Sequence, residues 1–370
     1  MRRLLLVVAI ALLAAAPARA GAPPVNARAY IIEDARTGEI LASSRAHDRV
    51  PIASITKLMT VLITLAHHKL TDVVTVDPRA AAVGESSIEL DPGDQLTVRD
   101  LIKGALIQSA NDAADALALS ISPDYPSFAK LMNDEAAALG LTDTHFVRPD
   151  GLDAPGEHSS AADVTKLARL LMHTRFIRET VGKETDTIAG GRTLHTWDDL
   201  LSLYSPTIGV KTGHTNAAGW CQVAAARGRG VTVYATLLGS PTRSERNVDL
   251  ESLLIWGLGQ FRVVPAVHTG TPYAQVQVPY GRAPLKLVAA KPLLAVARLG
   301  RPLTQTVTAP AVVSLPVKAG TVLGRVEIRA EGRVVGTRDL VASRTINKPT
   351  LPRRLAWYAG RALHHLGHLF

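Results

Sequence analysis

Three short motifs in the chain combine residue types that could carry out nucleophilic chemistry. The first is an S-x-x-K formed by Ser54 and Lys57. A serine hydroxyl is a weak nucleophile at neutral pH and needs a base beside it. Residues three apart lie on the same face of a helix, so Lys57 can reach the Ser54 hydroxyl. Burial or a nearby cation would have to lower the pKa of this lysine before it could accept a proton.

The second and third motifs add groups that could relay protons and bind a substrate. Ser109 and Asn111 form an S-x-N, whose serine could pass a proton to a leaving amine and whose asparagine could orient Lys57. Lys211–Gly213 is a K-T-G, which supplies a positive charge, a hydroxyl for a carboxylate and room for a substrate backbone. Alone, each motif is an ordinary helix face, loop triplet or strand end. In this order, the three are the signature of penicillin-binding proteins and class A β-lactamases.

The secondary structure predicted around the motifs would bring them together. Apolar residues recur at helical spacing from Ile55 to Ile63, which places Ser54 at or near a helix N-terminus. Three β-rich runs separated by short glycine-containing turns predict adjacent antiparallel strands at residues 207–212, 220–226 and 231–238. The other predicted elements are a hairpin at residues 29–42 and helices at 98–119, 126–139, 163–172 (capped by Ser160 or Asp163) and 243–258. This order predicts an α+β fold, an antiparallel sheet flanked by helices.

A second domain is predicted after Phe261, where the composition changes. Residues 263–345 are rich in Val, Thr, Pro and Gly, in short runs broken by turns, which predicts a small all-β domain. The last segment, residues 346–370, predicts an amphipathic helix with one apolar face formed by Leu355, Tyr358, Ala362, Leu366 and Leu369. Its arginines and Trp357 fit an interfacial membrane anchor. The alternatives are a frayed tail or a helix docked on the β-domain.

The first twenty residues have the pattern of a secretory signal peptide. Arg2 and Arg3 form a positive n-region, Leu4–Ala15 is a short apolar run, and residues 18–20 are a small-x-small cleavage site. No later stretch reaches about 18 uncharged apolar residues, so no transmembrane helix is expected. We predict residues 1–20 as signal, 21–262 as the domain with the three motifs, 263–345 as the β-domain and 346–370 as the anchor. The protein would be exported to the periplasm and held at the outer face of the cytoplasmic membrane.

The charge of the chain and its cysteine and histidine content limit the kinds of partner, disulfide and cofactor that we expect. The formal net charge of +9 falls to about +6 (9 − 3) when the three arginines of the signal are removed. In an exported protein, this surplus indicates an anionic membrane face rather than nucleic acid. Cys221 is the only cysteine, so no intramolecular disulfide can form, and we expect a buried structural thiol. The 12 histidines show no ligand spacing such as H-E-x-x-H, so we expect neither a metal nor another cofactor.

Over residues 29–261 the chain resembles the low-molecular-mass serine D-alanyl-D-alanine carboxypeptidases, a group of penicillin-binding proteins. The stretches that carry the resemblance are residues 33–41, 51–60, 108–113, 151–156 and 209–215. The β-domain and the terminal helix are similar to the family in architecture. The resemblance implies a β-lactamase/transpeptidase-like fold and a substrate, the peptidoglycan stem pentapeptide. It also implies β-lactam antibiotics as inhibitors.

The resemblance further implies roles for the motif residues. Ser54 would be acylated by the penultimate D-Ala, with Lys57 as proton acceptor and Ser109 as the shuttle to the departing D-Ala. The substrate-binding residues would be Asn111, Lys211, Thr212, Gly213 and His214. Of these, Lys211 and Thr212 would hold the terminal carboxylate. The backbone N–H groups of Ser54 and His214 would form the oxyanion hole.

Two features bear on alternatives within this resemblance. Many family members have Asn-x-Asn before two leucines, where this chain has Thr196 and Asp198, and the added charge would affect substrate preference. A class A β-lactamase needs a deacylating glutamate in an E-x-x-x-N loop. Between the second and third motifs the only asparagine is Asn133, with Ala129 four residues before it, so that loop is absent. A catalytically inert wall-binding homologue is the other alternative, which three intact motifs disfavour.

Overall fold

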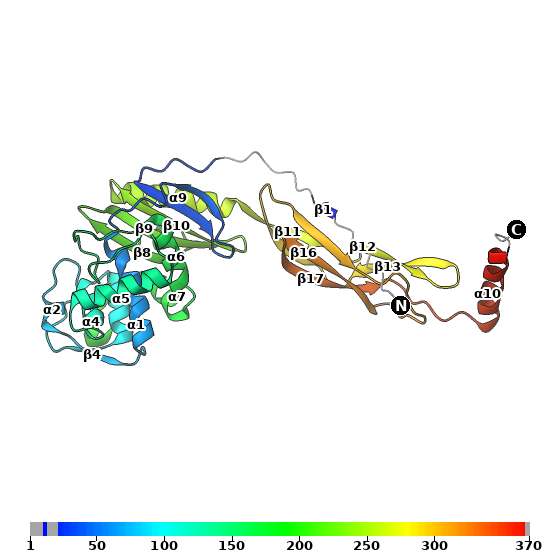
Figure 1. Cartoon of the computed structure of the whole chain (residues 1–370), viewed down its shortest axis with the longest axis horizontal. Coiled ribbons are helices and arrows are strands. Elements are labelled where there is room, and N and C mark those ends of the chain that lie inside the picture. Colours follow the sequence, from blue (N-terminus) through cyan, green and yellow to red (C-terminus); the bar gives the residue numbers. More distant parts are fainter. Residues whose placement is uncertain (1–9, 13–20, 367–370) are drawn as a thin grey trace. The chain divides into compact units, whose positions relative to one another are not determined.

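The computed structural model describes residues 10–12 and 21–366, with side chains up to Ala359, and divides into two compact units (Figure 1). The first unit ends at Gly259 and the second begins at Gln260. Most of the predicted signal peptide lies outside the described residues. Its described part, β1 (Ile10–Leu12), pairs with β15 (Leu303–Thr308) of the second unit.

The first unit is built on a five-stranded sheet in the order β3-β2-β10-β9-β8, in which all neighbouring strands are antiparallel. The strands are β2 (Ala29–Asp34), β3 (Ile40–Ser44), β8 (Thr207–Thr215), β9 (Gly219–Gly228) and β10 (Val231–Ser240). The predicted hairpin and the three predicted adjacent strands are therefore confirmed. The strand that carries the K-T-G motif, β8, lies at one edge of the sheet.

Helices cover both faces of this sheet (Figure 1). On one face lies α9 (Arg243–Gly259), which approaches so closely that a Cβ on Gly257 would lie 2.3 Å from Ile32 Cδ1. On the other lies α6 (Ala161–Leu171), where Thr165 Oγ1 is 2.6 Å from Thr236 Oγ1. Successive strand residues point to opposite faces, so the buried strands are apolar on both sides. The predicted α+β class, an antiparallel sheet flanked by helices, is confirmed.

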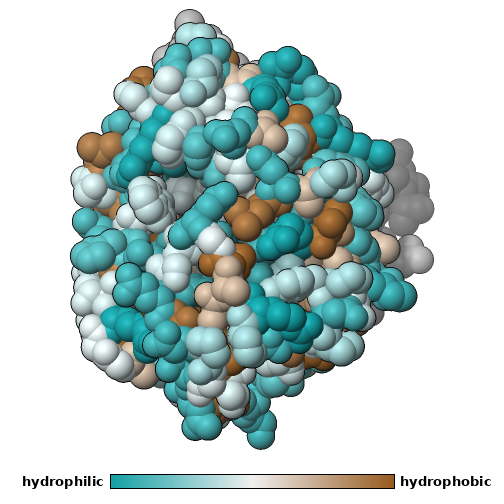
Figure 2. All heavy atoms as spheres, turned by 90° about the vertical axis from the view of Figure 1, so that its left-hand side faces the viewer, coloured by the Kyte–Doolittle hydropathy of each residue, from teal (hydrophilic) through white to brown (hydrophobic). Residues whose placement is uncertain are grey.

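A helical region connects β3 to β8 and carries the first two motifs. Its helices are α1 (Lys57–His67), α2 (Pro78–Ala81), α3 (Val98–Lys103), α4 (Asn111–Leu119), α5 (Tyr125–Ala138), α7 (Arg175–Val181) and α8 (Leu200–Leu203). Two small two-stranded antiparallel sheets complete it: β4 (Val73–Thr75) with β5 (Gln95–Thr97), and β6 (Thr185–Thr187) with β7 (Thr193–His195). The face shown in Figure 2 is mostly hydrophilic, and its hydrophobic residues form small, separate patches.

The single helix predicted for residues 98–119 is wrong. A π-helical turn at Gly104–Gln108 follows α3, and the chain then leaves helical geometry at Ser109, whose φ is +63°. A new helix, α4, starts at Asn111. Alanine and leucine on both sides favour helix, so their propensity conceals the break. The break places Ser109 just before the N-terminus of α4 and Asn111 at its first residue. Neither side chain is therefore packed within a continuous helix, and both can contribute to a site.

The second unit is a sandwich of β-sheets. Its larger sheet has the order β1-β15-β16-β17-β13-β12 and its smaller sheet pairs β11 with β14. The remaining strands are β11 (Phe261–Val267), β12 (Pro272–Val278), β13 (Arg282–Ala289), β14 (Leu293–Arg298), β16 (Val322–Ala330) and β17 (Arg333–Ala342). Alternate residues such as Leu287 and Ile328 are buried between the sheets. The predicted all-β C-terminal domain is confirmed. After it comes α10 (Leu351–Leu366), and among the described residues no helix is long and apolar enough to cross a bilayer.

Candidate active site

Ser54 lies on a tight turn immediately before α1. The turn, Ala53–Thr56, is a 3-10 helix, and Lys57 is the first residue of α1. A 3-10 turn has three residues per turn, so side chains at i and i+3 eclipse each other. Lys57 Nζ accordingly lies 2.7 Å from Ser54 Oγ. The sequence places Ser54 at the start of a helix, and the structure shows the tighter turn that aligns the two side chains.

The surroundings of Lys57 suit a lysine that loses its proton easily. Its ammonium nitrogen also lies 2.7 Å from Asn111 Oδ1 and 2.6 Å from the carbonyl oxygen of Asp150. Complete burial lowers the pKa of Lys57 to about 8, although nearby carboxylates, Asp150 and Asp115 first, act to raise it. An uncharged amine has two N–H groups and one lone pair. The two carbonyl oxygens can accept the N–H groups, which leaves the lone pair for the Ser54 hydroxyl.

Buried carboxylates surround the base. Asp150 forms an ion pair with Arg148 at 2.6 Å, and Glu157 Oε1 accepts a hydrogen bond from Thr56 Oγ1 at 2.8 Å. Burial raises the pKa of Glu157 to about 7. Burial, and then the charge of Asp150, raises the pKa of Asp115 to about 7. Glu157 and Asp115 therefore change charge in a pH range close to that of Lys57, so the charge of Lys57 depends on the ionisation of these two carboxyl groups.

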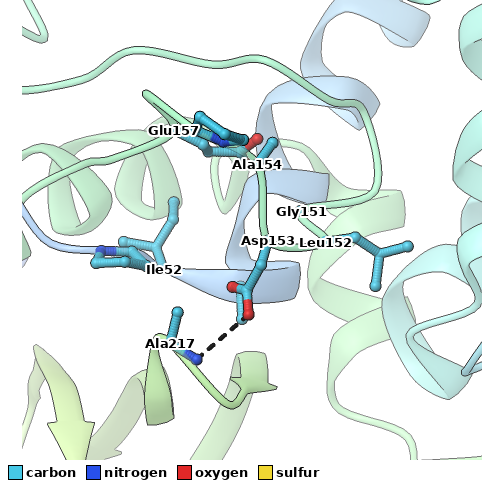
Figure 3. A pocket seen from close by; sticks show the side chains of 10 residues that line it. Ile52, Gly151, Leu152, Asp153, Ala154, Glu157 and Ala217 are labelled. Carbon is cyan, nitrogen blue, oxygen red and sulfur yellow. Dashed lines mark hydrogen bonds between the residues drawn. The ribbon is translucent and has the colours of Figure 1, made fainter.

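The loop from Gly151 to Glu157 lies next to Ile52, just before the nucleophile turn, and the two line a pocket together with Ala217 (Figure 3). Gly151 has φ +78°, and a Cβ there would lie 2.2 Å from the carbonyl oxygen of Ala53. Only glycine allows the loop to lie this close to the turn. In the same loop, the Asp153 carboxylate accepts hydrogen bonds from Thr215 Oγ1 at 2.6 Å and from Ala217 N–H at 3.2 Å. The loop therefore fixes the end of β8 relative to Ser54.

Lys211 and Ser109 form a second hydrogen-bonded pair. Lys211 Nζ lies 2.8 Å from Ser109 Oγ and 2.7 Å from the carbonyl oxygen of Thr212. Burial, and then the charge of Lys57, lowers the pKa of Lys211 well below its usual value, while Asp198 acts to raise it. Ser109 has a left-handed backbone (φ +63°), which is uncommon for a residue other than glycine. This strained conformation directs its hydroxyl to the lysine of the third motif.

The structure brings all eight sequence-predicted site residues together. Six of them line one pocket: Ser54, Ser109, Asn111, Thr212, Gly213 and His214. Lys57 and Lys211 lie buried beneath it and contact its walls. A Cβ on Gly213 would lie 2.8 Å from the carbonyl oxygen of Ile52 and 3.1 Å from Ser54 N. Glycine is thus required for β8 to run this close to the nucleophile, next to the two N–H groups expected to form the oxyanion hole.

Sequence reasoning missed Arg246, which also lines the pocket. It is only 1% exposed, its Nη2 lies 3.2 Å from Asp199 Oδ2, and its guanidinium lies 5.7 Å from the centre of the Trp220 ring. A signal was present: Arg246, Leu250, Leu253 and Gly257 occupy the buried stripe of α9. An arginine on an otherwise apolar helix stripe is either paired or functional.

The departure at Thr196 and Asp198 also falls at the site. Asp198 is buried, and its Oδ1 accepts hydrogen bonds from Gln222 Nε2 at 2.7 Å and Leu200 N–H at 3.1 Å. Its pKa is raised by burial. Trp197, which lies between Thr196 and Asp198 in the sequence, lines the pocket and donates its Nε1–H to the carbonyl oxygen of Gln108 at 3.0 Å. The pocket therefore has an aromatic wall where the sequence indicated only an added charge.

Cys221 takes no part in the hydrogen bonds around Ser54, and its environment is that of a structural thiol. Cys221 is buried, and burial raises the pKa of its thiol to about 11, as expected for a structural cysteine. Within residues 10–12 and 21–366, no three His, Cys, Asp or Glu side chains gather as a possible metal site. The groups described nearest Ser54 are hydroxyls, amines and an amide, and the carboxylates Asp115, Asp150 and Glu157 lie close enough to act on the pKa of Lys57.

Comparison with known proteins identifies two family models along the chain. A model described as "D-alanyl-D-alanine carboxypeptidase" matches residues 16–242. A model described as "Penicillin-binding protein 5, C-terminal domain" matches residues 261–348. Together they match most of both structural units and leave unmatched the two ends of the chain and residues 243–260, which include α9.

Individual relatives and solved structures agree with these models. The chain is 32% identical to D-alanyl-D-alanine carboxypeptidase DacC of Escherichia coli (strain K12), over 88% of this chain and 86% of that protein. It is 29% identical to DacF of Bacillus subtilis (strain 168), over 87% and 86%. Penicillin binding protein 5 from Haemophilus influenzae matches with a TM-score of 0.65 and 26% identity, over 89% of this chain and 100% of that chain. A mutant of Streptomyces K15 DD-transpeptidase matches with a TM-score of 0.61 and 32% identity, over 64% and 99%.

Proposed function

The chain belongs to the D-alanyl-D-alanine carboxypeptidase family of serine peptidases, and on this premise we propose that it removes the terminal D-alanine of peptidoglycan pentapeptides through an acyl-enzyme on Ser54. One observation carries the proposal. The buried amine of Lys57, whose pKa is lowered to about 8, lies 2.7 Å from the Ser54 hydroxyl, which opens onto a pocket. An alcohol beside an uncharged amine is an activated nucleophile.

The proposed reaction has two halves. Lys57 takes the proton of the Ser54 hydroxyl as its oxygen attacks the penultimate D-Ala carbonyl, and backbone N–H groups of Ser54 and His214 stabilise the oxyanion. The C–N bond then breaks as Ser109, hydrogen-bonded to Lys211, gives its hydroxyl proton to the departing D-Ala amine. The proton that Lys57 took from Ser54 replaces it, so Ser109 is again a hydroxyl and Lys57 is again an uncharged amine. Water next attacks the ester, which releases the shortened peptide and returns the proton to Ser54. Asn111 holds the Lys57 amine in place throughout.

The direct test is incubation of the protein with a synthetic stem pentapeptide, followed by mass spectrometry. The proposal requires the loss of one alanine residue and the appearance of free D-alanine. If the pentapeptide stays intact under conditions where the protein is folded, the chain is an inert homologue. Rapid hydrolysis of penicillin would instead favour a β-lactamase, whereas the absence of an E-x-x-x-N loop leads us to expect a long-lived penicilloyl-enzyme.

The pH dependence of the reaction should follow the Lys57 proton. Below about pH 8, the amine is protonated and has no lone pair, so kcat/KM should fall by about tenfold per pH unit towards acid. Lys211 lies in the same site and its charge affects Lys57, so the midpoint of the kcat/KM profile reports the titration of both lysines together. Asp115 raises the pKa of Lys57 when ionised, and Asp115→Asn should therefore move the midpoint to lower pH. A pH profile of kcat/KM for both proteins checks this, and an unmoved or higher midpoint in the variant would refute it.

Arg246 is proposed to join Lys211 and Thr212 in binding the terminal carboxylate, because it is a buried cation that lines the pocket directly. Arg246→Gln should lower kcat/KM for the pentapeptide by about 10- to 100-fold, the value of a charge-assisted hydrogen bond. The same peptide with a C-terminal amide should lose far less. Arg243→Gln is a matched control, because Arg243 contacts the same Asp199 but is not among the residues lining the pocket. Equal losses for acid and amide substrates would show that Arg246 has a structural role only.

We also propose that the protein is exported and held at the outer face of the cytoplasmic membrane. The support is the sequence pattern of residues 1–20 and the amphipathic character of α10. On α10, Leu351, Leu355 and Tyr358 follow helical spacing and are 65%, 62% and 55% exposed. Fractionation of cells that express the whole protein, with and without a high-salt wash, tests the location.

A further inference from the structure

Charge is divided very unevenly between the two units. Residues 21–260 contain 22 Lys and Arg against 29 Asp and Glu (22 − 29 = −7). Residues 261–350 contain 13 Lys and Arg against only 3 acids (13 − 3 = +10). A small domain with such a surplus attracts anionic surfaces. The excess belongs to the β-domain itself and lies outside both α10 and the active site.

The three acids of the β-domain are all paired with arginines. Glu327 lies 2.9 Å from Arg329 and Glu331 lies 2.9 Å from Arg301. Asp339 lies 4.0 Å from Arg325. Glu331 is in the turn between β16 and β17, at the end of β17 remote from α10. The opposite end of the domain therefore holds cations without acidic neighbours.

That opposite end carries five cations, here named the basic collar: Arg282, Lys286, Lys318, Arg344 and Lys348. Backbone and side-chain hydrogen bonds connect the segments that bear them. Arg282 donates to the carbonyl oxygen of Asn347 at 2.9 Å, and Arg344 donates to that of Ala283 at 2.9 Å. Ser343 N–H donates to the carbonyl oxygen of Lys286 at 3.1 Å. The segments 279–288, 317–322 and 342–350 contain no Asp or Glu.

Aromatic side chains sit beside the collar where α10 begins. The ring of Tyr280, in the turn between β12 and β13, lies 5.4 Å from that of Trp357 and 6.2 Å from that of Tyr358, both on α10. These three residues, here the aromatic cluster, attach α10 to the β-domain turn. Amphipathic aromatic rings gather at the level of lipid head groups, with cations close by. The collar and the cluster are therefore complementary to the same kind of surface.

We propose that this end of the β-domain is a second membrane contact, in which the basic collar binds anionic phospholipid head groups and the aromatic cluster lies at the interface. The inference rests on the proposed attachment through α10 and extends it to the folded domain. Two contacts would hold the β-domain against the bilayer, whereas a helix alone would leave it free to swing. An anionic bilayer is favoured over a soluble polyanion because the exposed apolar stripe of α10 emerges beside the collar.

The test is binding of the whole protein to lipid vesicles, measured by co-sedimentation. One set is neutral phosphatidylcholine, and in the other about a third of the lipid is phosphatidylglycerol. The collar variant is Lys286→Gln, Lys318→Gln and Lys348→Gln together, which leaves the hydrogen-bonding arginines in place. We expect its partition coefficient on anionic vesicles to fall by about 10- to 100-fold at about 0.1 M salt. On neutral vesicles it should equal the unchanged protein.

A matched variant removes the same number of charges elsewhere on the β-domain: Arg262→Gln, Lys291→Gln and Arg333→Gln. Arg333 begins β17 and lies about 30 Å from the collar end of that strand, several Debye lengths away. This control should lose less than about threefold. Equal losses in the two variants, or none in the collar variant, would overturn the proposal. So would displacement from vesicles by linear polyphosphate at equal phosphate concentration, because that result would identify a soluble polyanion as the partner.

These outcomes distinguish a failure of the collar proposal from a failure of the proposed attachment through α10. If the unchanged protein ignores vesicles altogether, the attachment through α10 fails as well. If it binds but the collar variant binds equally, only the collar fails. Carboxypeptidase activity on a soluble pentapeptide should be the same in all three proteins, since none of the changes lies in the catalytic unit.

Discussion

Ser54→Ala should reduce kcat/KM for the pentapeptide by at least about 10⁴-fold, the scale of loss when a serine peptidase lacks its nucleophile. No other hydroxyl can replace it, because the Lys57 amine is aligned with Ser54 by a single 3-10 turn. Only one oxygen is removed from a half-buried side chain, so the protein should stay folded. Steady-state kinetics on the pentapeptide, with a thermal melt of each protein, make the measurement.

Ser86→Ala is the matched control for this loss. Ser86 lines the same pocket, but its hydroxyl donates to the carbonyl oxygen of Gln108 at 2.9 Å. Ser86→Ala should lower kcat/KM for the pentapeptide by less than about tenfold, the scale of one neutral hydrogen bond. If Ser54→Ala kept most of its activity, or lost no more than Ser86→Ala, the nucleophile would be a different group and the mechanism proposed above would be wrong.

Replacing Lys57 should be nearly as damaging. We expect Lys57→Met to lower the rate of acylation by about 10²- to 10⁴-fold, the usual contribution of a general base. The informative companion is Lys57→Arg. Arginine preserves the positive charge but stays protonated in proteins, so it cannot accept the Ser54 proton. The two variants should therefore be similarly slow.

Stopped-flow or quenched measurements of penicillin acylation give this rate without the later steps. Lys103→Met is a suitable control, because Lys103 pairs with Asp186 at 2.9 Å and belongs to neither lysine pair of the site. Substantial activity in Lys57→Arg would contradict the base mechanism, since it would show that Lys57 contributes charge alone.

The motifs could be predicted from the sequence because each one is local. The spacing of three residues between Ser54 and Lys57 predicts that their side chains meet on one helix face. The glycine of the K-T-G predicts a place where another backbone can approach closely. The hairpin and the three adjacent strands follow from turn residues and alternating apolar runs, and the structure contains them. The long-range assembly is also implied, since motifs of one family share one site. The sequence pattern therefore predicts which residues make up the site, but it does not predict their pKa values.

The features that were missed depend on tertiary packing. The helix break before Ser109 is hidden by alanine-rich sequence, which favours helix on both sides. Arg246 reaches the pocket only because α9 packs on one face of the sheet, and the position of Trp197 in the pocket wall follows from its contact with Gln108. The buried carboxylates Asp115 and Glu157 come from segments about forty residues apart. No local pattern indicates that burial raises the pKa of each to about 7.

The most direct test of the central claim is to trap the covalent intermediate. The folded protein is incubated with penicillin and its intact mass is measured, followed by peptide mapping. The account predicts a mass increase of one penicillin molecule per chain, stable over many minutes and located on the peptide containing Ser54, with no increase in Ser54→Ala. An adduct on another residue, or a labelled Ser54→Ala protein, would contradict it.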